Sequence, residues 1–302
     1  MQSGRGTYRL AVFTKNRLNP AYTGARLGAD RVARRLGCTL THHVPDKPDD
    51  VDEQRALLTA ALGERPDAIL LAPTHATALN DVLERVRAAG IPLLCIVSRP
   101  DDIAVTAYIG SDDRALARGI AEHLFQHLPS GGDVVTLEGH PNAMTTAPRT
   151  AGFRDAAANR PGVRIAASRA GQFQYAEGRD AMAALLDSEP RIDGVLAAND
   201  VMALGALEAM RARKRMLPTV GINATPEGVQ AIQAGELLAS ASFNAMKMAC
   251  LGVEAAVRVL AGETVPQTIM LPVEIVHRGN CAAWALPYAE RPLPDWDEDV
   301  RG

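Results

Sequence analysis

The chain has 302 residues, of which 47% are hydrophobic and 22% charged, with a formal net charge of −3. A single core rarely organises a chain of this length, so two lobes are expected. The small negative charge and the lack of a basic run argue against a nucleic-acid partner. No apolar stretch approaches the ~20 residues that a membrane-spanning helix needs.

Apolar strands and amphipathic helices alternate along the whole chain. The strands are expected at 8–13, 39–43, 68–71, 92–97, 105–109, 133–137, 163–167, 195–198, 219–222 and 239–242. Helices are expected between them, for example at 21–36, 78–89, 114–128, 175–186, 200–213 and 226–234. Asn19-Pro20 and Thr225-Pro226 are typical helix starts, and Gly90 and Gly235 are typical helix ends. The alternation predicts βαβ units, and about five strands on each side of residue 110 predict two Rossmann-like lobes with parallel sheets.

The four cysteines do not form a disulfide framework. Cys38 and Cys95 lie in or next to strands that are expected to be three strands apart, roughly 14 Å, which is too far for a disulfide. Cys250 and Cys281 have no evident partner. We therefore expect unpaired, buried thiols.

Signatures of catalysis are absent from the sequence. It has no phosphate-binding loop, no G-x-G-x-x-G after the first strand, no H-E-x-x-H and no G-x-S-x-G. His123 and His127 lie four residues apart on one face of an expected helix. They could be a pair of metal ligands or part of a solvent-exposed face, and the second interpretation is favoured. We predict no catalytic residues, no metal site and no cofactor.

Polar and aromatic residues instead follow successive strands. Asn199 directly follows a buried strand and is either a plain helix cap or a ligand-facing amide. Phe173 stands between two glutamines and is either a core residue or one wall of a site. Arginine forks, amides and flat aromatic faces suit hydroxyls, carboxylates and sugar rings. The pattern therefore indicates recognition of a small solute across a crevice between the lobes.

Several of these motifs resemble one known family. They are Asn19-Pro20 with an aromatic two residues further on, Ser98-Arg99, Arg149-Thr-Ala-Gly-Phe153, Ala198-Asn199-Asp200 with Gly205, and Gly221-Ile-Asn223. Over about residues 8–278 the chain resembles the ribose-binding, type I class of periplasmic substrate-binding proteins of sugar ABC transporters. The resemblance implies two α/β lobes with 2-1-3-4-5 sheets, joined by a three-crossover hinge that closes over the ligand. It places residues 1–111 and 243–272 in the N-terminal lobe, and 112–242 and 273–302 in the C-terminal lobe.

The resemblance also implies the ligand contacts. They are Lys15, Asn19, Tyr22, Ser98, Arg99, Arg149, Phe173, Asn199, Asn223 and Phe243. Ribose binders have aspartates at the positions of Ser98 and Asn223, a serine at Lys15 and a glutamine at Phe243, and one of their usual aromatics is Ala21 here. Ribose itself is therefore doubtful, whereas a ring-shaped polyhydroxy ligand is expected. Whether Phe243 or Asn244 faces that ligand stays open.

The charge of the ligand also stays open. Lys15, Arg99 and Arg149 are positive, and no carboxylate is assigned to the site, because Asp200 is expected to cap its helix. A sugar acid would offset these charges, whereas a neutral sugar or polyol is expected if Lys15 reaches solvent.

The expected function is a monomeric solute-binding receptor that delivers a small carbohydrate-like ligand to an ABC-transporter permease. It is expected to be periplasmic, with its leader peptide removed. The alternative is the effector-binding core of a lactose-repressor-type transcription regulator, which needs a DNA-binding segment of roughly 60 residues before the first strand. An enzyme on this architecture has no catalytic set to support it.

Overall fold

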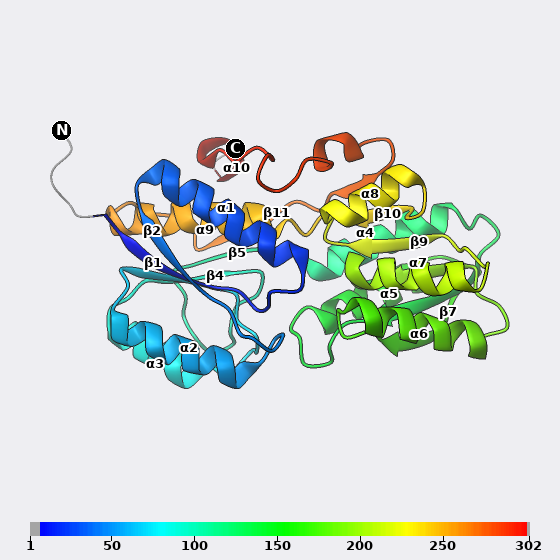
Figure 1. The fold of residues 1–302 in the computed structure, drawn as a ribbon, viewed down its shortest axis with the longest axis horizontal. Helices are drawn as coiled ribbons and strands as arrows, with labels where there is room; N and C mark the ends of the chain where they lie inside the picture. The colour runs from blue at the N-terminus through cyan, green and yellow to red at the C-terminus, as the bar shows by residue number, and fades with distance from the viewer. Residues whose placement is uncertain (1–6, 301–302) are drawn as a thin grey trace. The chain divides into compact units, whose positions relative to one another are not determined.

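A computed structural model describes residues 7–300 of the chain. These residues form two compact units, and each is described by itself (Figure 1). Unit 1 comprises Met1–Gly110, Ala245–Leu271 and Tyr288–Gly302, and unit 2 comprises Ser111–Asn244 and Pro272–Pro287. No helix among the described residues is long and apolar enough to cross a membrane.

Unit 1 is a six-stranded sheet in the order β11-β5-β4-β3-β1-β2, covered by helices on both faces. Helices α1 and α9 lie on one face and α2 and α3 on the other (Figure 1). Its elements are β1 (Arg9–Phe13), α1 (Pro20–Leu36), β2 (Thr39–His43), α2 (Val51–Glu64), β3 (Ala68–Leu71), α3 (Asn80–Ala88), β4 (Leu93–Ile96), β5 (Ala107–Ser111), α9 (Ala245–Leu260), β11 (Thr268–Leu271) and α10 (Trp296–Val300).

Unit 2 repeats this architecture, with the strand order β12-β10-β9-β8-β6-β7. Helix α4 packs with α5, and α6 packs with α7. Its elements are α4 (Asp113–Gln126), β6 (Gly132–Glu138), α5 (Thr146–Ala158), β7 (Val163–Ala170), α6 (Tyr175–Ser188), β8 (Gly194–Ala197), α7 (Asp200–Ala212), β9 (Thr219–Ile222), α8 (Pro226–Ala234), β10 (Ala239–Ala241), β12 (Ile275–His277) and the 3-10 helix η1 (Cys281–Trp284).

The central strands of both sheets are continuous apolar runs because helices cover both of their faces. Strands β3, β4, β8 and β9 are buried at every position, whereas the edge strands β2 and β7 are partly exposed. The 2-1-3-4-5 order implied by the resemblance is confirmed in both sheets, and β11 and β12 extend it by one strand each. All four cysteines are free and buried, as predicted.

The predicted helix ends agree with the structure where a cap is present. Asn19 precedes α1 and accepts a hydrogen bond from the Ala21 N–H, with Pro20 in the first turn. Thr225 caps α8 in the same way, and Gly235 ends that helix with a left-handed φ of 76°. Asparagine and threonine oxygens satisfy N–H groups that the first turn of a helix leaves unpaired.

The chain passes between the units four times, after residues 110, 244, 271 and 287, which is one passage more than the three crossovers that the resemblance implied. The first three passages lie within two residues of the predicted boundaries. The assignment of residues 273–302 to the C-terminal lobe is wrong for Tyr288–Val300, which belongs to unit 1, and residues 301–302 lie outside the described part of the chain. The physical reason is that this segment packs on α1 and α9, where the Arg31 guanidinium binds its backbone.

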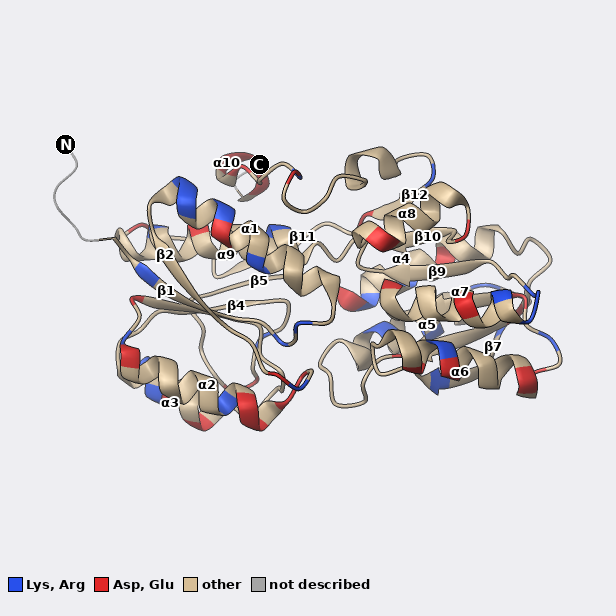
Figure 2. Ribbon diagram, viewed as in Figure 1, with Lys and Arg blue, Asp and Glu red and all other residues tan. Residues whose placement is uncertain are grey.

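Charged residues of both signs are interspersed on the outer helices α2, α3, α6 and α7 (Figure 2). Many of them pair locally, for example Arg213 with Asp187 at 2.9 Å and Arg55 with Asp81 at 2.6 Å. Exposed pairs of this kind contribute little to stability, typically below about 1 kcal/mol.

Candidate functional site

In unit 2, the candidate site is built around Arg149, a 3% exposed residue in the first turns of α5. Its Nε donates to the Asp113 Oδ1 at 2.7 Å, and its Nη1 donates to the Ala198 carbonyl oxygen at 2.6 Å. Asp113 opens α4, and its side chain is only 10% exposed. A buried, hydrogen-bonded pair of this kind balances the arginine charge and fixes the guanidinium in place.

Two aromatic rings flank the same guanidinium. Its central carbon lies 5.7 Å from the centroid of the Phe173 ring and 5.0 Å from that of Phe243. Both distances are within the range of cation–π attraction. Phe243 follows β10 and is 4% exposed, whereas Phe173 lies between β7 and α6 and is half-buried. Unit 2 thus brings together three residues that the sequence places far apart.

Phe173 is held in an unusual backbone conformation. Gln172 and Phe173 have φ angles of 55° and 61°, a left-handed region that disfavours residues with a Cβ. The Phe173 carbonyl accepts a hydrogen bond from Asn199 Nδ2 at 3.1 Å. Its ring also lies against Gly139, where an added Cβ would overlap it. The surrounding structure therefore stabilises a strained turn, a feature often found at binding sites.

Asn199 has a structural role in this arrangement. Besides holding Phe173, it caps α7 by accepting from the Met202 N–H at 2.8 Å, and it is fully buried. The sequence left open whether Asn199 is a cap or a ligand-facing amide, and the structure shows the cap. The expectation that Asp200 caps this helix is wrong, because the residue before it does so.

Asp200 instead supports the loop that carries Asn223. Its Oδ1 accepts from Ser240 Oγ at 2.6 Å, and its Oδ2 accepts from the Thr225 N–H at 2.8 Å. Ser240 Oγ in turn accepts from the Ala224 N–H at 2.9 Å. These bonds stabilise the turn after β9, where Asn223 has a φ of 129° and is 6% exposed.

Burial of Asp200 makes folding stability depend on pH. Desolvation raises the pKa of this carboxyl to about 6, although its bonds to Ser240 and Thr225 oppose the rise. Because the folded chain holds this proton more tightly than the unfolded chain, the contribution of Asp200 to stability decreases as pH rises from about 4 to 6. Asp200→Asn removes this titration. The free energy of unfolding of the variant minus that of wild type should therefore increase by roughly 2–3 kcal/mol between about pH 4 and pH 6. Urea denaturation at several pH values measures this difference, and a difference independent of pH would contradict the assignment.

In unit 1, the predicted residues lie after β1 and β4. Lys15 is 2% exposed, and its Nζ donates to Ser98 Oγ at 3.2 Å. Asn19 is half-buried with its side-chain oxygen engaged in the α1 cap, and Tyr22 is 7% exposed in the first turn of that helix. The structure therefore brings Lys15 and Ser98 together, and the alternative in which Lys15 reaches solvent is wrong because its side chain is buried.

The turn before Ser98 is also strained. Val97 has a φ of 70°, which is rare for a β-branched residue, and the Ser98 N–H donates to the Ile96 carbonyl at 2.7 Å. Tyr108 stabilises the turn, because its hydroxyl donates a hydrogen bond to the Val97 carbonyl at 3.1 Å. Arg99 is exposed, and its guanidinium carbon lies 5.8 Å from the centroid of the Tyr108 ring.

The sequence reasoning missed Asp113. It began the helix at Arg114 and assigned no carboxylate to the site, which is wrong because Asp113 pairs with Arg149. The available signal was the one used for the other residues, namely a polar side chain close after a strand, here two residues after β5. Of the three positive side chains that favour an acidic ligand, Arg149 is already balanced by Asp113.

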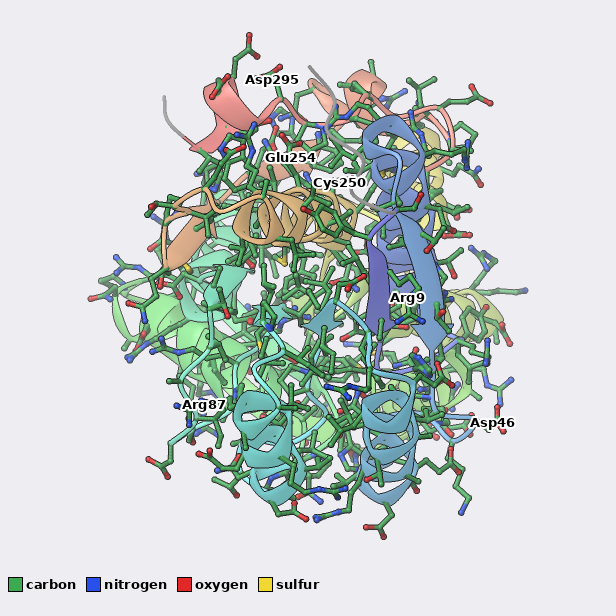
Figure 3. The ribbon with its side chains drawn as sticks, turned by 90° about the vertical axis from the view of Figure 1, so that its left-hand side faces the viewer. Arg9, Asp46, Arg87, Cys250, Glu254 and Asp295 are labelled. Carbon is green, nitrogen blue, oxygen red and sulfur yellow. The ribbon has the colours of Figure 1, made fainter. Side chains whose placement is uncertain are left out.

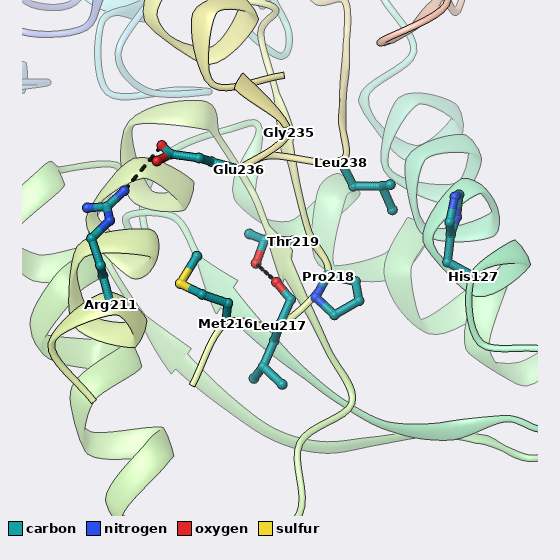
Figure 4. Close-up of a pocket in the computed structure, with 9 residues that line it drawn as sticks. All are labelled: His127, Arg211, Met216, Leu217, Pro218, Thr219, Gly235, Glu236 and Leu238. Atoms are coloured by element: carbon teal, nitrogen blue, oxygen red, sulfur yellow. Dashed lines mark hydrogen bonds and ion pairs between the residues drawn. The ribbon is translucent and has the colours of Figure 1, made fainter. Parts of the chain in front are cut away.

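One pocket of unit 2 lies away from this site. A cavity of about 500 Å³ lies at the amino end of β9, lined by His127, Arg211, Met216, Leu217, Pro218, Thr219, Gly235, Glu236 and Leu238 (Figure 4). An ion pair of 3.2 Å between Arg211 and Glu236 borders it. Ligands of open parallel sheets bind at the carboxyl ends of the strands, so this pocket is at the opposite edge. Among residues 7–300, no group of three His, Cys, Asp or Glu residues could hold a metal ion.

Comparison with known proteins agrees with this geometry. Residues 10–264 match the model of the periplasmic binding protein domain. The chain belongs to the periplasmic binding protein family. It is 28% identical to the ribose import binding protein of Bacillus subtilis (strain 168), over 89% of this chain and 86% of that protein. It is 32% identical to the D-ribose/D-allose-binding protein of Pseudomonas aeruginosa, over 75% of each chain.

Solved structures of this family have the same fold. A periplasmic solute binding protein from Actinobacillus succinogenes with bound D-allose superimposes with a TM-score of 0.87 at 22% identity, over 90% of this chain and 98% of that one. A solute binding protein from Bacillus halodurans with bound myo-inositol gives a TM-score of 0.85 at 26% identity, over 93% and 98%. The family consists of transport receptors rather than enzymes, in agreement with the missing catalytic signatures.

Proposed function

We propose that the protein is a receptor that captures a small neutral sugar or polyol and delivers it to an ABC-transporter permease. The observation that carries this proposal is the Arg149 cluster, in which a charge-balanced guanidinium lies against two aromatic rings. Ribose, allose and myo-inositol, named for the relatives, are neutral and polyhydroxylated, which supports the same ligand class.

The chemistry of the cluster suits such a ligand. Aromatic faces pack against the C–H groups of a ring, while carboxylate and guanidinium groups bind hydroxyls. Arg149 has five N–H donors, of which two are used by Asp113 and Ala198, so the remaining ones can bind hydroxyls. In unit 2, a sugar acid would add a negative charge beside Asp113, whose carboxylate already balances Arg149, and this favours a neutral ligand. Lys15 and Arg99 of unit 1 are the remaining cations of the proposed site, and the comparison of matched aldoses and aldonates described below tests their effect.

We propose that both units contribute to one site. From unit 1 the contacts are Lys15, Asn19, Tyr22, Ser98 and Arg99, and from unit 2 they are Asp113, Arg149, Phe173, Asn223 and Phe243. Asn199 is assigned to positioning Phe173, because its amide is fully buried and already bonded. A ligand that contacts both units stabilises their closed arrangement by its differential affinity for it.

The same proposal includes the cellular setting. We propose a periplasmic protein that acts as a monomer and meets a membrane permease, and membership of the periplasmic binding protein family supports the compartment. The relatives include import binding proteins, which is the observation that supports the permease as partner.

A ligand screen tests the proposal. Thermal unfolding should be measured against aldoses, polyols and the aldonates that match the aldoses. A ligand at 100 times its Kd stabilises the protein by about 2.7 kcal/mol, a readily detected rise in Tm. We expect the neutral member of a matched pair to bind at least about tenfold more tightly, and small-angle scattering to show compaction with it. Preference for the aldonate would contradict the neutral ligand, and turnover of the sugar would contradict a receptor.

A further inference from the structure

The segment after β4 carries two of the proposed sugar contacts, Ser98 and Arg99, and it lies wholly within unit 1. The Ser98 N–H donates to the Ile96 carbonyl at 2.7 Å, which closes a three-residue turn around Val97. We call this the Val97 turn. A three-residue turn with a positive φ at its centre is rare and strained, and the φ of 70° at Val97 is especially costly for a β-branched residue. Contacts from outside the turn must therefore stabilise it.

Strand β5 supplies these contacts. The Val97 N–H donates to the Ile109 carbonyl at 3.1 Å, and the Val97 carbonyl accepts from the Tyr108 hydroxyl at 3.1 Å. Both backbone groups of Val97 are thus bonded to neighbouring residues of one strand. The first bond extends the pairing of the parallel strands β4 and β5. The second is made by a side chain, and a phenylalanine at residue 108 could not make it.

The Tyr108 ring reaches the Val97 turn because Gly110 follows it on the same strand. Side chains at alternate strand positions lie on the same face of a sheet. A Cβ added at Gly110 would overlap the Tyr108 hydroxyl oxygen and the ring carbon that bears it. The ring therefore occupies the space that a side chain at residue 110 would fill, and it also packs against the buried core of unit 1.

The Tyr108 ring also lies beside the Arg99 side chain. The guanidinium carbon is 5.8 Å from the ring centroid, within the range of cation–π attraction. The backbone of Arg99 is restricted by the turn before it and by Pro100 after it. The chain is anchored again at Asp101, whose N–H donates to the Ala76 carbonyl at 2.7 Å. The exposed side chain of Arg99 is thus the part that needs ordering, and the ring offers it a flat face.

The Val97 turn also sets the position of Ser98 relative to Lys15. Ser98 Oγ accepts from Lys15 Nζ at 3.2 Å, and both residues are buried. This distance is at the upper end of the normal range for a hydrogen bond, so a small shift of the turn breaks the bond. The conformation of one strained turn therefore affects three of the proposed unit 1 contacts.

We propose that Tyr108 is a positioning residue of the sugar site, because its hydroxyl holds the turn that presents Ser98 and its ring orients the Arg99 guanidinium. This inference rests on the proposed function, in which Ser98 and Arg99 contact the sugar. Tyr108 itself is not one of the proposed contacts. It raises affinity through its neighbours, since contacts that are already ordered lose less entropy on binding.

The test removes one hydroxyl group. Tyr108→Phe keeps the ring and deletes the bond to the Val97 carbonyl. The matched control is Tyr8→Phe, because the Tyr8 hydroxyl also donates to a backbone carbonyl of unit 1, that of Leu260, at the same distance of 3.1 Å. Figure 3 labels Arg9, the neighbour of Tyr8 at the amino end of β1, whereas the Val97 turn follows the carboxyl end of β4. The two hydroxyls therefore act at opposite edges of one parallel sheet.

Hydrogen exchange without ligand measures the stability of the Val97 turn. The Ser98 amide should exchange roughly three- to tenfold faster in Tyr108→Phe than in wild type, as the net contribution of one hydrogen bond implies. It should exchange at the wild-type rate in Tyr8→Phe. An unchanged rate in Tyr108→Phe, or an equal rise in Tyr8→Phe, would overturn the proposal. Because no sugar is present, this result is independent of the screen that tests the proposed function.

Calorimetry with the sugar found by the screen measures the effect on binding. Tyr108→Phe should raise Kd by roughly three- to tenfold, and Tyr8→Phe should leave it unchanged. Tyr108→Leu, which also removes the flat face, should raise Kd further. That additional increase should disappear when Arg99→Ala is also present, because the ring acts through this guanidinium. A wild-type Kd in Tyr108→Phe would overturn the role of the hydroxyl, and an increase that persists without Arg99 would overturn the role of the ring.

Discussion

Replacing Arg149 with alanine should reduce affinity for the sugar found by the screen by at least about 30-fold, equivalent to about 2–4 kcal/mol. The substitution removes charge-assisted donors from a 3% exposed position and also removes the contact that lies between the rings of Phe173 and Phe243. It also breaks the buried ion pair between Arg149 and Asp113, so the free energy of unfolding should fall as well, by about 3–5 kcal/mol.

Titration calorimetry and urea denaturation separate the two effects. Asp113→Asn keeps an oxygen acceptor for the Arg149 Nε but removes the charge, and it should lose less stability than Arg149→Ala. Arg114→Ala is the matched control, because the Arg114–Asp155 pair is exposed and contributes below about 1 kcal/mol. Affinity close to that of wild type in Arg149→Ala would show that this guanidinium does not contact the ligand.

Replacing Asn199 with alanine should destabilise the protein by about 2–4 kcal/mol and should weaken sugar binding together with it. The fully buried side chain makes two hydrogen bonds, one from the Met202 N–H and one to the Phe173 carbonyl. Loss of the second bond releases the left-handed turn that sets the orientation of the Phe173 ring. The stability loss is therefore expected to exceed that of an ordinary helix cap.

Asp112→Ala provides the comparison, because Asp112 caps α4 through one bond, to the Ala115 N–H, and makes no equivalent second contact within residues 7–300. Asp112→Ala should lower the free energy of unfolding by about 1 kcal/mol. The readout specific to positioning is the fluorescence of Phe173→Trp, whose response to sugar should diminish when Asn199 is also replaced. An undiminished response, or stability losses equal to those of Asp112→Ala, would argue that Asn199 is a cap and nothing more.

Most of the local structure could be predicted from sequence because its causes are local. Asn19-Pro20 and Gly235 mark helix ends through hydrogen bonds within one turn. The fully apolar strand at 195–198 indicates that helices cover both faces of the sheet there. The carboxyl ends of parallel strands share one edge, so the positions of Asn199 and Asn223 directly after their strands are enough to place both residues near a site.

The pairing within the site could not be predicted in the same way. Asp113 and Arg149 are 36 residues apart and meet only because α4 packs on α5. Asp200 resembles a helix cap in sequence, yet its carboxylate turns to Ser240, 40 residues away. The first contact depends on which helices share a face of the sheet, and the second depends on the strand order that places β10 two strands from β8.

The sequence by itself determined the alternation of strands and helices, the two lobes, the family and the strand ends that carry polar groups. Each of these follows from periodicity, caps and motifs that act over a few residues. Tertiary structure alone decided the charge balance at Arg149, the strained turn at Phe173 and the unit to which residues 288–300 belong. Arg31 and Arg291 are 260 residues apart, and no local pattern records a contact over that separation. Such contacts arise from packing between complete elements, so they appear only when the whole chain has folded.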